Sequence, residues 1–247
     1  GENRPVTLPR PAFAVSLAAT RLYDVAKASA GGVSAVVRKY VRAKAESEFE
    51  LSPIPAGPVL FVNASLVPSY DLLARIMKLT QRGRGYLVQN DSRVAAAYFE
   101  TAPAGAAAQD EKGITAFLVG QQRPNMHEDL PLVTMPHEVV KYHQKFFKEN
   151  IRHVVKGSDE ISPGVFVGKD VKIHPTAVFD STPGPIVLGD SVTVGPFAYF
   201  IGPAVVAHHT KIIERASIKE EVQIGHHCKI GGEVECTIIQ GYSNKAH

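Results

Sequence analysis

The sequence contains few cysteines. Only Cys228 and Cys236 occur in 247 residues, so we expect no disulfide framework. The two cysteines are eight residues apart and form no CxxC pair, which is a poor match to a zinc-binding motif. We therefore name no metal-ligating residues from the cysteine pattern.

Long apolar runs, a signal-peptide pattern and a strong net charge are also lacking. The longest apolar stretches, such as Val59–Val62 and Ala95–Phe99, are far too short to span a bilayer. The first residues, Gly1–Pro5, do not have the anatomy of a secretory signal. A net charge of +3 gives no reason to expect nucleic acid or a membrane surface as a partner. These features predict a cytoplasmic protein.

A six-residue repeat runs through the C-terminal third of the chain, from about Ile161 onward. All thirteen lead positions are apolar, and one three-residue insertion interrupts the series. The lead residues are Ile161, Val167, Ile173, Phe179, Leu188, Val194, Phe200, Val206, Ile212, Ile218, Ile224, Ile230 and Cys236. A small or aliphatic residue stands four positions after most of them. Ordinary alternating strands do not keep one period this long, so the repeat predicts a parallel β-helix.

The physical basis of this period is a triangular coil. Three hexads make three short strands and three corners, and successive coils stack at the strand spacing of about 4.8 Å. The lead side chains then form a column inside the prism, and each coil buries its neighbours. Ser181–Pro185 reads as a loop that leaves one corner.

The first 158 residues predict a separate mixed α/β domain, so we place the domains at 1–158 and 159–247. We expect strands at Val33–Val37 and Gly57–Asn63 and helices at Tyr70–Leu79 and His137–Asn150. Ser69 is the expected N-cap of the first of these helices, because its hydroxyl can accept a backbone N–H of the first turn.

Two segments of the β-helix region, Lys229–His247 and Gly195–Ala198, resemble an alternative bacterial family of sugar-phosphate nucleotidyltransferases. Leu60–Ala64 and Met135–Val140 carry the resemblance in the N-terminal half. The family is similar to the bifunctional enzyme that acetylates glucosamine 1-phosphate and then makes UDP-N-acetylglucosamine. The resemblance implies a nucleotidyltransferase-like α/β domain followed by a left-handed parallel β-helix. It also implies a homotrimer whose partners are sugar 1-phosphates and nucleotides.

The resemblance assigns candidate residues near the end of the sequence. The stretch Asn244-Lys245-Ala246-His247 looks like the catalytic turn of the acetyltransferases. His247 would be the general base that takes a proton from the amino sugar before its attack on acetyl-CoA, and Asn244 and Lys245 would bind substrate. An imidazole suits this role because its pKa lies near the working pH. The alternative is an exposed histidine without a role. The resemblance also implies further coils, without which we expect no acetyl transfer.

In the N-terminal half the sequence departs from ordinary sugar nucleotidyltransferases. Neither common glycine pattern of a phosphate loop is present, and Ala18–Leu22 stands in the comparable place. Arg21 could bind a phosphate there or be an ordinary surface arginine. Asn63 could orient a sugar or base, or cap the following turn. Ser65 stands where the resemblance would place an aspartate that binds Mg²⁺, although the family implies Mg²⁺ as a cofactor.

Two histidine pairs suggest a rival function. His208-His209 and His226-His227 are eighteen residues apart, which is one full coil, so the pairs should stack. Such a ladder could bind a metal in a trimeric β-helix enzyme of the carbonic anhydrase type, or it could be a solvated face. The main expectation remains nucleotidyl transfer to a sugar 1-phosphate, acetylation of an amino-sugar phosphate, or both. A catalytically weak binding or scaffold relative is the second alternative.

Overall fold

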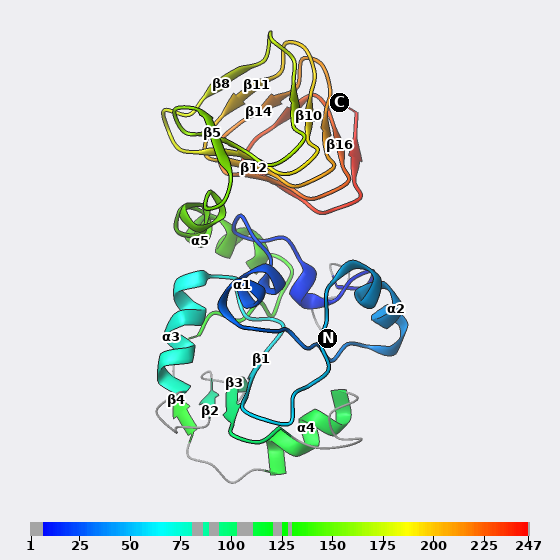
Figure 1. Ribbon diagram of the computed structural model, residues 1–247, viewed down its shortest axis with the longest axis vertical. Helices are drawn as coiled ribbons and strands as arrows, with labels where there is room; N and C mark the ends of the chain where they lie inside the picture. Colours follow the sequence, from blue (N-terminus) through cyan, green and yellow to red (C-terminus); the bar gives the residue numbers. More distant parts are fainter. Residues whose placement is uncertain are drawn as a thin grey trace. The chain divides into compact units, whose positions relative to one another are not determined.

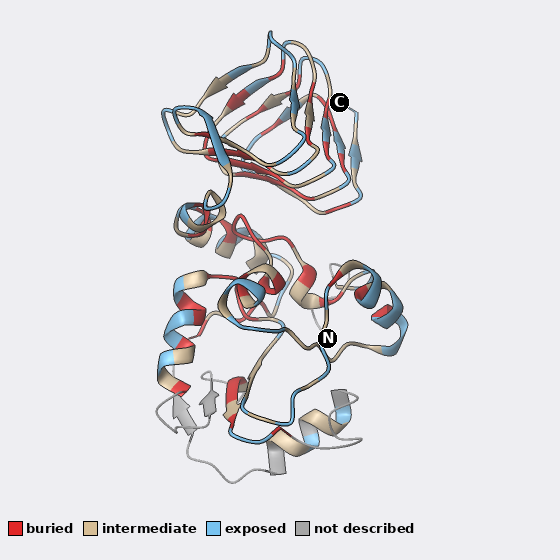
Figure 2. Ribbon diagram, viewed as in Figure 1, coloured by how far each residue is buried: buried red, intermediate tan, exposed pale blue. Residues whose placement is uncertain are grey.

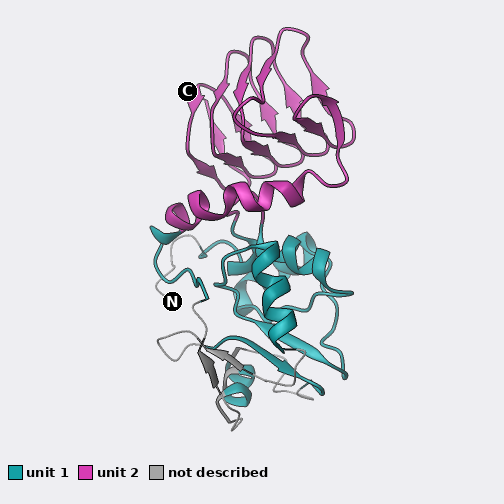
Figure 3. Cartoon of the chain, turned by 90° about the vertical axis from the view of Figure 1, so that its left-hand side faces the viewer, with its two compact units in different colours: residues 1–15, 21–138 teal, residues 16–20, 139–247 magenta. Residues whose placement is uncertain are grey.

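The computed structural model describes residues 7–80, 86–88, 94–102, 111–120, 125–127 and 130–246 (Figure 1). The chain divides into two compact units, coloured separately in Figure 3. Residues 1–15 and 21–138 form unit 1, and residues 16–20 and 139–247 form unit 2. None of the helices in these described ranges is long and apolar enough to cross a lipid bilayer.

Unit 1 combines a small mixed sheet with short helices. Its elements are η1 (Ala12–Ala14), α1 (Leu22–Ser29), α2 (Lys39–Glu48), β1 (Val59–Val62), α3 (Tyr70–Thr80), β2 (Tyr86–Val88), β3 (Val94–Phe99), α4 (Glu111–Gly120) and β4 (Asn125–His127). The strand order is β1-β3-β2-β4. Strand β3 runs antiparallel to both of its neighbours, whereas β2 and β4 are parallel.

Helix α3 confirms the predicted helix and shows why it forms. The Ser69 hydroxyl accepts the Leu72 N–H at 3.0 Å, so it caps the first turn as expected. Asp71 lies in the same turn, where a negative charge favours the helix dipole. Leu72 and Ile76, one turn apart, are buried against the strand residues Ala95 and Ala96. This packing fixes α3 on the sheet.

The predicted strand at Val33–Val37 is wrong. These residues form no strand, and Val33 and Val37 instead pack against a cluster that includes Tyr23 and Phe49. The rings of Tyr23 and Phe49 meet edge to face, with centroids 4.7 Å apart. The β-branched side chains of Val33 and Val37 therefore pack from a loop into this hydrophobic cluster. Helix α2 follows the loop directly.

Unit 2 is a parallel β-helix with one long helix on it, α5 (Glu138–Val154). Its strands are β5 (Asp159–Ser162), β6 (Val165–Val167), β7 (Lys172–Ile173), β8 (Val178–Asp180), β9 (Ile186–Leu188), β10 (Thr193–Val194), β11 (Tyr199–Ile201), β12 (Ala204–Val206), β13 (Lys211–Ile212), β14 (Ser217–Ile218), β15 (Val222–Ile224), β16 (Lys229–Ile230), β17 (Glu233–Val234), β18 (Ile238–Ile239) and β19 (Asn244–Lys245). They form three sheets, ordered β18-β15-β12-β9-β6-β5, β19-β16-β13-β10-β7 and β17-β14-β11-β8. Four coils are complete, and β18 and β19 begin a fifth (Figure 1).

The lead residues of the repeat fill the prism, as predicted. From Leu188 to Ile230 every lead side chain is buried, and the interior strand positions are red in Figure 2. Phe179 and Phe200 stack one coil apart, with ring centroids 5.0 Å apart. The coils therefore stabilise one another through a continuous apolar column.

The two ends of the predicted series need correction. Ile161 is 53% exposed, because β5 turns back antiparallel to β6 and lies outside the coils. Gly164, with φ +73°, allows this tight hairpin. The β-helix therefore starts at Val165. At the other end Val234, and not Cys236, aligns with Ile218, because this coil is two residues shorter.

Helix α5 confirms the predicted helix at His137–Asn150 and extends it to Val154. Its buried side chains Phe147 and Ile151 pack on Val187 and Val205, which point outward from the sheet that contains β9 and β12. Figure 3 shows α5 running along the β-helix within unit 2. One face of the prism is therefore covered by this helix.

Candidate functional site

The hook segment, Ser16–Thr20, is the part of the N-terminal region that belongs to unit 2. It is a tight turn in which Leu17 and Thr20 exchange both backbone hydrogen bonds, at 2.9 and 3.2 Å. Ala18 and Ala19 have φ values of +53° and +69°, a region that alanine seldom adopts. All five residues are buried. Such a conformation persists only where the surroundings hold it.

Side chains of the β-helix and α5 hold the backbone of the hook segment. Gln240 makes a two-way pair with Ser16, accepting its N–H at 2.9 Å and donating to its carbonyl at 2.8 Å. Gln223 accepts the Ala19 N–H at 3.1 Å and donates to the Thr20 carbonyl at 3.3 Å.

Two side chains of α5 complete the set. Asn150 donates to the Ala18 carbonyl at 2.8 Å, and His143 accepts the Ala18 N–H through Nδ1 at 3.1 Å. All five backbone N–H groups of the hook segment therefore have partners.

The imidazole of His143 is held in one neutral tautomer. Its Nδ1 faces the Ala18 N–H, which can only donate, and its Nε2 lies 2.9 Å from the Glu221 carbonyl, which can only accept. Nε2 must therefore carry the proton. Burial lowers the pKa of His143, and the bond to the Glu221 carbonyl opposes this shift in part.

Arg21 follows the hook segment and lies in unit 1. Its guanidinium makes a two-pronged contact with Asp24, at 2.7 Å through Nε and 2.8 Å through the second nitrogen. It also lies 5.4 Å from the ring centroid of Phe49, and the side chain is only 20% exposed. Arg21 is therefore not a solvated surface residue in this conformation, and its fork is occupied by a carboxylate.

Asn63 stands at the end of β1. Its Nδ2 donates to the Val94 carbonyl at 3.1 Å, and its Oδ1 accepts the Ser65 N–H at 2.9 Å. The amide thus stabilises the turn after the strand, as an Asx turn does. No hydrogen bond among the described residues joins Asn63 to Arg21.

The candidates near the end of the sequence lie in β19, except for His247, which falls outside the described residues. Lys245 aligns with Ile230, so it occupies the register position of a lead residue. Its ammonium donates to the Gly231 carbonyl at 2.9 Å. Asn244 is exposed and lies beside Lys229. Asn244 and Lys245 are consecutive in β19, so their side chains point to opposite faces of the strand, and Lys245 has a backbone partner.

The two histidine pairs do stack, as their spacing predicts. The rings of His208 and His226 are parallel, with centroids 5.0 Å apart and an interplanar angle of 5°. The centroids of His209 and His227 are 4.9 Å apart. Among the described residues, no three histidine, cysteine, aspartate or glutamate side chains are placed to hold one metal ion.

Sequence patterns did not reveal His143, Asn150, Gln223 and Gln240 as partners of the hook segment. A weak signal exists for Gln223, because it stands in register between the outward-facing Val205 and Ile238. An amide among these outward-facing apolar residues indicates that a polar partner covers this face of the sheet. The pattern does not show which segment supplies the partner.

Comparison with known proteins places the N-terminal region in a family. The family described as sugar nucleotidyl transferase matches residues 3–159, which is more than half of the chain, and the match ends where β5 begins. A comparison with curated proteins found no match. The family match confirms the predicted nucleotidyltransferase class of the α/β region. The chain belongs to the sugar nucleotidyl transferase family.

Proposed function

We propose that this protein serves sugar-nucleotide biosynthesis by transferring a nucleotidyl group to a sugar 1-phosphate. The family match over residues 3–159 is the observation that carries the proposal, because it spans all the described elements of unit 1. In this reaction a phosphate oxygen of the sugar attacks the α-phosphorus of a nucleoside triphosphate, and pyrophosphate leaves. The protein would contribute by positioning the reactants and neutralising their charge.

Arg21 is our candidate phosphate ligand. A guanidinium fork matches two phosphate oxygens as well as it matches a carboxylate. Since Asp24 occupies both prongs, a phosphate must displace that carboxylate to bind. Removal of the carboxylate should then strengthen nucleotide binding, whereas removal of the guanidinium should weaken it.

Asn63 is the candidate for orienting the sugar or base, because its amide still has one N–H and one lone pair beyond its two backbone bonds. The turn after β1 offers fewer suitable ligands for Mg²⁺. Asn63, Ala64 and Ser65 form the turn after β1 and carry no carboxylate, although Mg²⁺ prefers carboxylate ligands. These residues do not fit a metal site of that kind, and the proposed steps do not depend on one.

A binding or scaffold role is the second candidate, and the hook segment favours it. The resemblance would place a phosphate-gripping loop at Ala18–Leu22, which overlaps the hook segment, yet every backbone N–H of Ser16–Thr20 already has a partner within unit 2. Acetyl transfer from acetyl-CoA stays a further prediction. It depends on His247 as the general base and on Asn244 and Lys245 as substrate ligands.

A coupled assay for pyrophosphate tests the proposal. Each common nucleoside triphosphate is paired with a panel of sugar 1-phosphates in the presence of Mg²⁺, and thermal stabilisation is recorded for the same ligands. A ligand at one hundred times its Kd should add about 2.7 kcal/mol to stability. Pyrophosphate release by one pair supports the proposal. Stabilisation without turnover favours the binding role. The absence of both pyrophosphate release and stabilisation refutes nucleotidyl transfer.

Variants of the Arg21–Asp24 pair sharpen this experiment. Asp24→Asn should tighten nucleotide binding and Arg21→Gln should weaken it by about tenfold or more, since a charge-assisted bond contributes roughly 1.5–3 kcal/mol. Glu50→Gln is the matched control, because it breaks the exposed ion pair with Lys27 and leaves Arg21 untouched. Equal binding by all three variants would remove Arg21 from the site.

A further inference from the structure

The histidine corner, defined as His208, His209, His226 and His227, brings four imidazole rings together in unit 2. It lies at one corner of the prism, between the sheets that contain β12 and β13. The exposed His209 and His227 face solvent, while His208 and His226 are half-buried. Adjacent rings within and between coils have centroids 4.9–5.4 Å apart.

Two imidazole nitrogens in this corner lie within hydrogen-bond distance of each other. Nδ1 of His226 and Nδ1 of His227 are 3.0 Å apart. A neutral imidazole nitrogen without a proton is an acceptor and a metal ligand, so two of them at this distance must share either a proton or a metal ion. The first state requires one ring to carry its proton on Nδ1, and the second requires both Nδ1 atoms to be unprotonated.

The distance favours one coordination geometry. With metal–nitrogen bonds of about 2.0–2.1 Å, nitrogens 3.0 Å apart subtend roughly 91–97° at the metal. Neighbouring positions of a tetragonal ion meet this angle, whereas a tetrahedral ion would need about 3.3 Å between the nitrogens. Aligning both lone pairs requires ring rotation, and the second torsion of histidine is soft. Tetragonal nitrogen sites are typical of Cu²⁺ and Ni²⁺.

Gly241 provides a second, independent observation. Its φ is not in the left-handed region, so its backbone does not require glycine. A Cβ at this position would lie 2.8 Å from Nε2 of His226 and about as close to two ring carbons, at 3.0 and 3.1 Å. The absence of a side chain thus makes room for the His226 imidazole. Tyr242 then stacks on His227, with centroids 5.2 Å apart. Both rings are positioned by the following coil.

We propose that the histidine corner binds a borderline divalent metal ion, Cu²⁺ or Ni²⁺, chelated by Nδ1 of His226 and Nδ1 of His227. Water fills the remaining positions, because no third protein ligand among the described residues converges on this point. The site is formed by residues of unit 2, whereas the candidate residues for nucleotidyl transfer belong to unit 1, and it needs no second subunit.

Titration of the full chain with CuCl₂ at pH 7.5, followed by calorimetry, tests the proposal. We expect one equivalent to bind at the corner, and electron paramagnetic resonance should show two coordinating imidazole nitrogens. His227→Ala should weaken binding by more than about tenfold, because even outer-shell partners of metal ligands contribute 10–100-fold. His227 is exposed, so this variant should keep its melting temperature. His226→Ala should have the same effect on binding.

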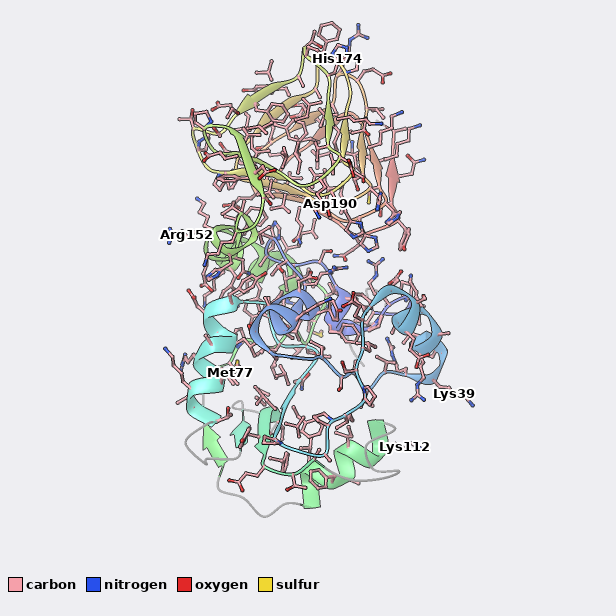
Figure 4. The ribbon with its side chains drawn as sticks, viewed as in Figure 1. Lys39, Met77, Lys112, Arg152, His174 and Asp190 are labelled. Atoms are coloured by element: carbon pink, nitrogen blue, oxygen red, sulfur yellow. The ribbon has the colours of Figure 1, made fainter. Side chains whose placement is uncertain are left out.

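His174→Ala is the matched control. His174 is exposed and bonds to Thr176. In Figure 4 it lies at a different corner of the β-helix from Asp190, whose carbonyl accepts the His209 N–H at 2.8 Å. This variant should bind Cu²⁺ like the wild type. Binding should also weaken at pH 5.5, since both Nδ1 atoms must be unprotonated. The proposal is overturned if the wild type binds no Cu²⁺, if His227→Ala binds it equally well, or if His174→Ala loses it to the same degree.

Discussion

Replacing His143 with phenylalanine keeps a ring in a fully buried position and removes both hydrogen bonds of the imidazole. The Ala18 N–H then has no partner, in a residue with no exposed surface. An unsatisfied buried donor costs about 1–3 kcal/mol, so unit 2 should lose stability by that amount. The packing of the ring on Phe147, with centroids 4.8 Å apart, should survive the change.

The same variant should change how stability depends on pH. Burial holds the pKa of His143 below its ordinary value of 6.5, so the unfolded chain takes up a proton at a higher pH than the folded chain does. The stability contributed by the neutral His143 is complete above pH 6.5 and falls as the pH drops from 6.5 to the folded-state pKa of this residue. The largest slope from this one proton is about 1.4 kcal/mol per pH unit. Below the folded-state pKa the loss is complete.

Hydrogen exchange measured by mass spectrometry can follow the hook segment directly. After correction for intrinsic exchange rates, protection of Ser16–Thr20 in the wild type should fall by up to about tenfold per pH unit below pH 6.5. In His143→Phe the protection should be low throughout and this slope absent. His153→Phe, on the same helix but not bonded to the hook segment, is the control and should retain the slope. An unchanged slope in His143→Phe would refute the assignment.

Three further predictions concern the β-helix. Phe200→Ala should destabilise unit 2 by about 3–5 kcal/mol in chemical denaturation, because the ring is fully buried and stacked on Phe179, and a loss below about 1 kcal/mol would contradict its place in the column. Ile161→Ala should cost less than about 1 kcal/mol in the same assay, since the side chain is half exposed and outside the coils; a large loss would return it to the core. We also propose a homotrimer that buries the exposed Phe197 and Tyr199, so Tyr199→Glu should lower the mass measured by light scattering, and a monomeric wild type would contradict this.

The β-helix could be predicted because its side-chain period is local and repeats many times. Thirteen apolar lead positions specify which residues point inward, and the structure places eleven of them in the column. The prediction fails at both ends, at Ile161 because β5 turns back antiparallel to β6, and at Cys236 because its coil is shorter. Cys236 is apolar at the right spacing, yet two residues are missing from its coil and Val234 takes the inward place.

In unit 1 the local signals were weaker. Helix α3 has a cap and a broad apolar face, so its sequence predicts it well. Helix α2 buries only Val41 and Ala45, and so narrow a stripe is hard to distinguish from a loop. Val33 and Val37 have strand-forming side chains, but a propensity does not show whether a partner strand exists.

The hook segment shows why the candidate site was harder to predict than the fold. Its partners Gln223 and Gln240 are more than 200 residues away in sequence, and they point outward from the prism, where the repeat imposes no residue type. The same contacts bear on function. All five backbone N–H groups have partners: those of Ser16, Ala18 and Ala19 bond to matched amide and imidazole side chains, and those of Leu17 and Thr20 bond to backbone carbonyls within the hook segment. Ala18 and Ala19 are the two alanines in a strained conformation. Matched buried bonds of this kind are costly to break one at a time. A nucleotide that binds near Arg21 must therefore do so with the hook segment in place, using side chains and not the backbone of Ser16–Thr20.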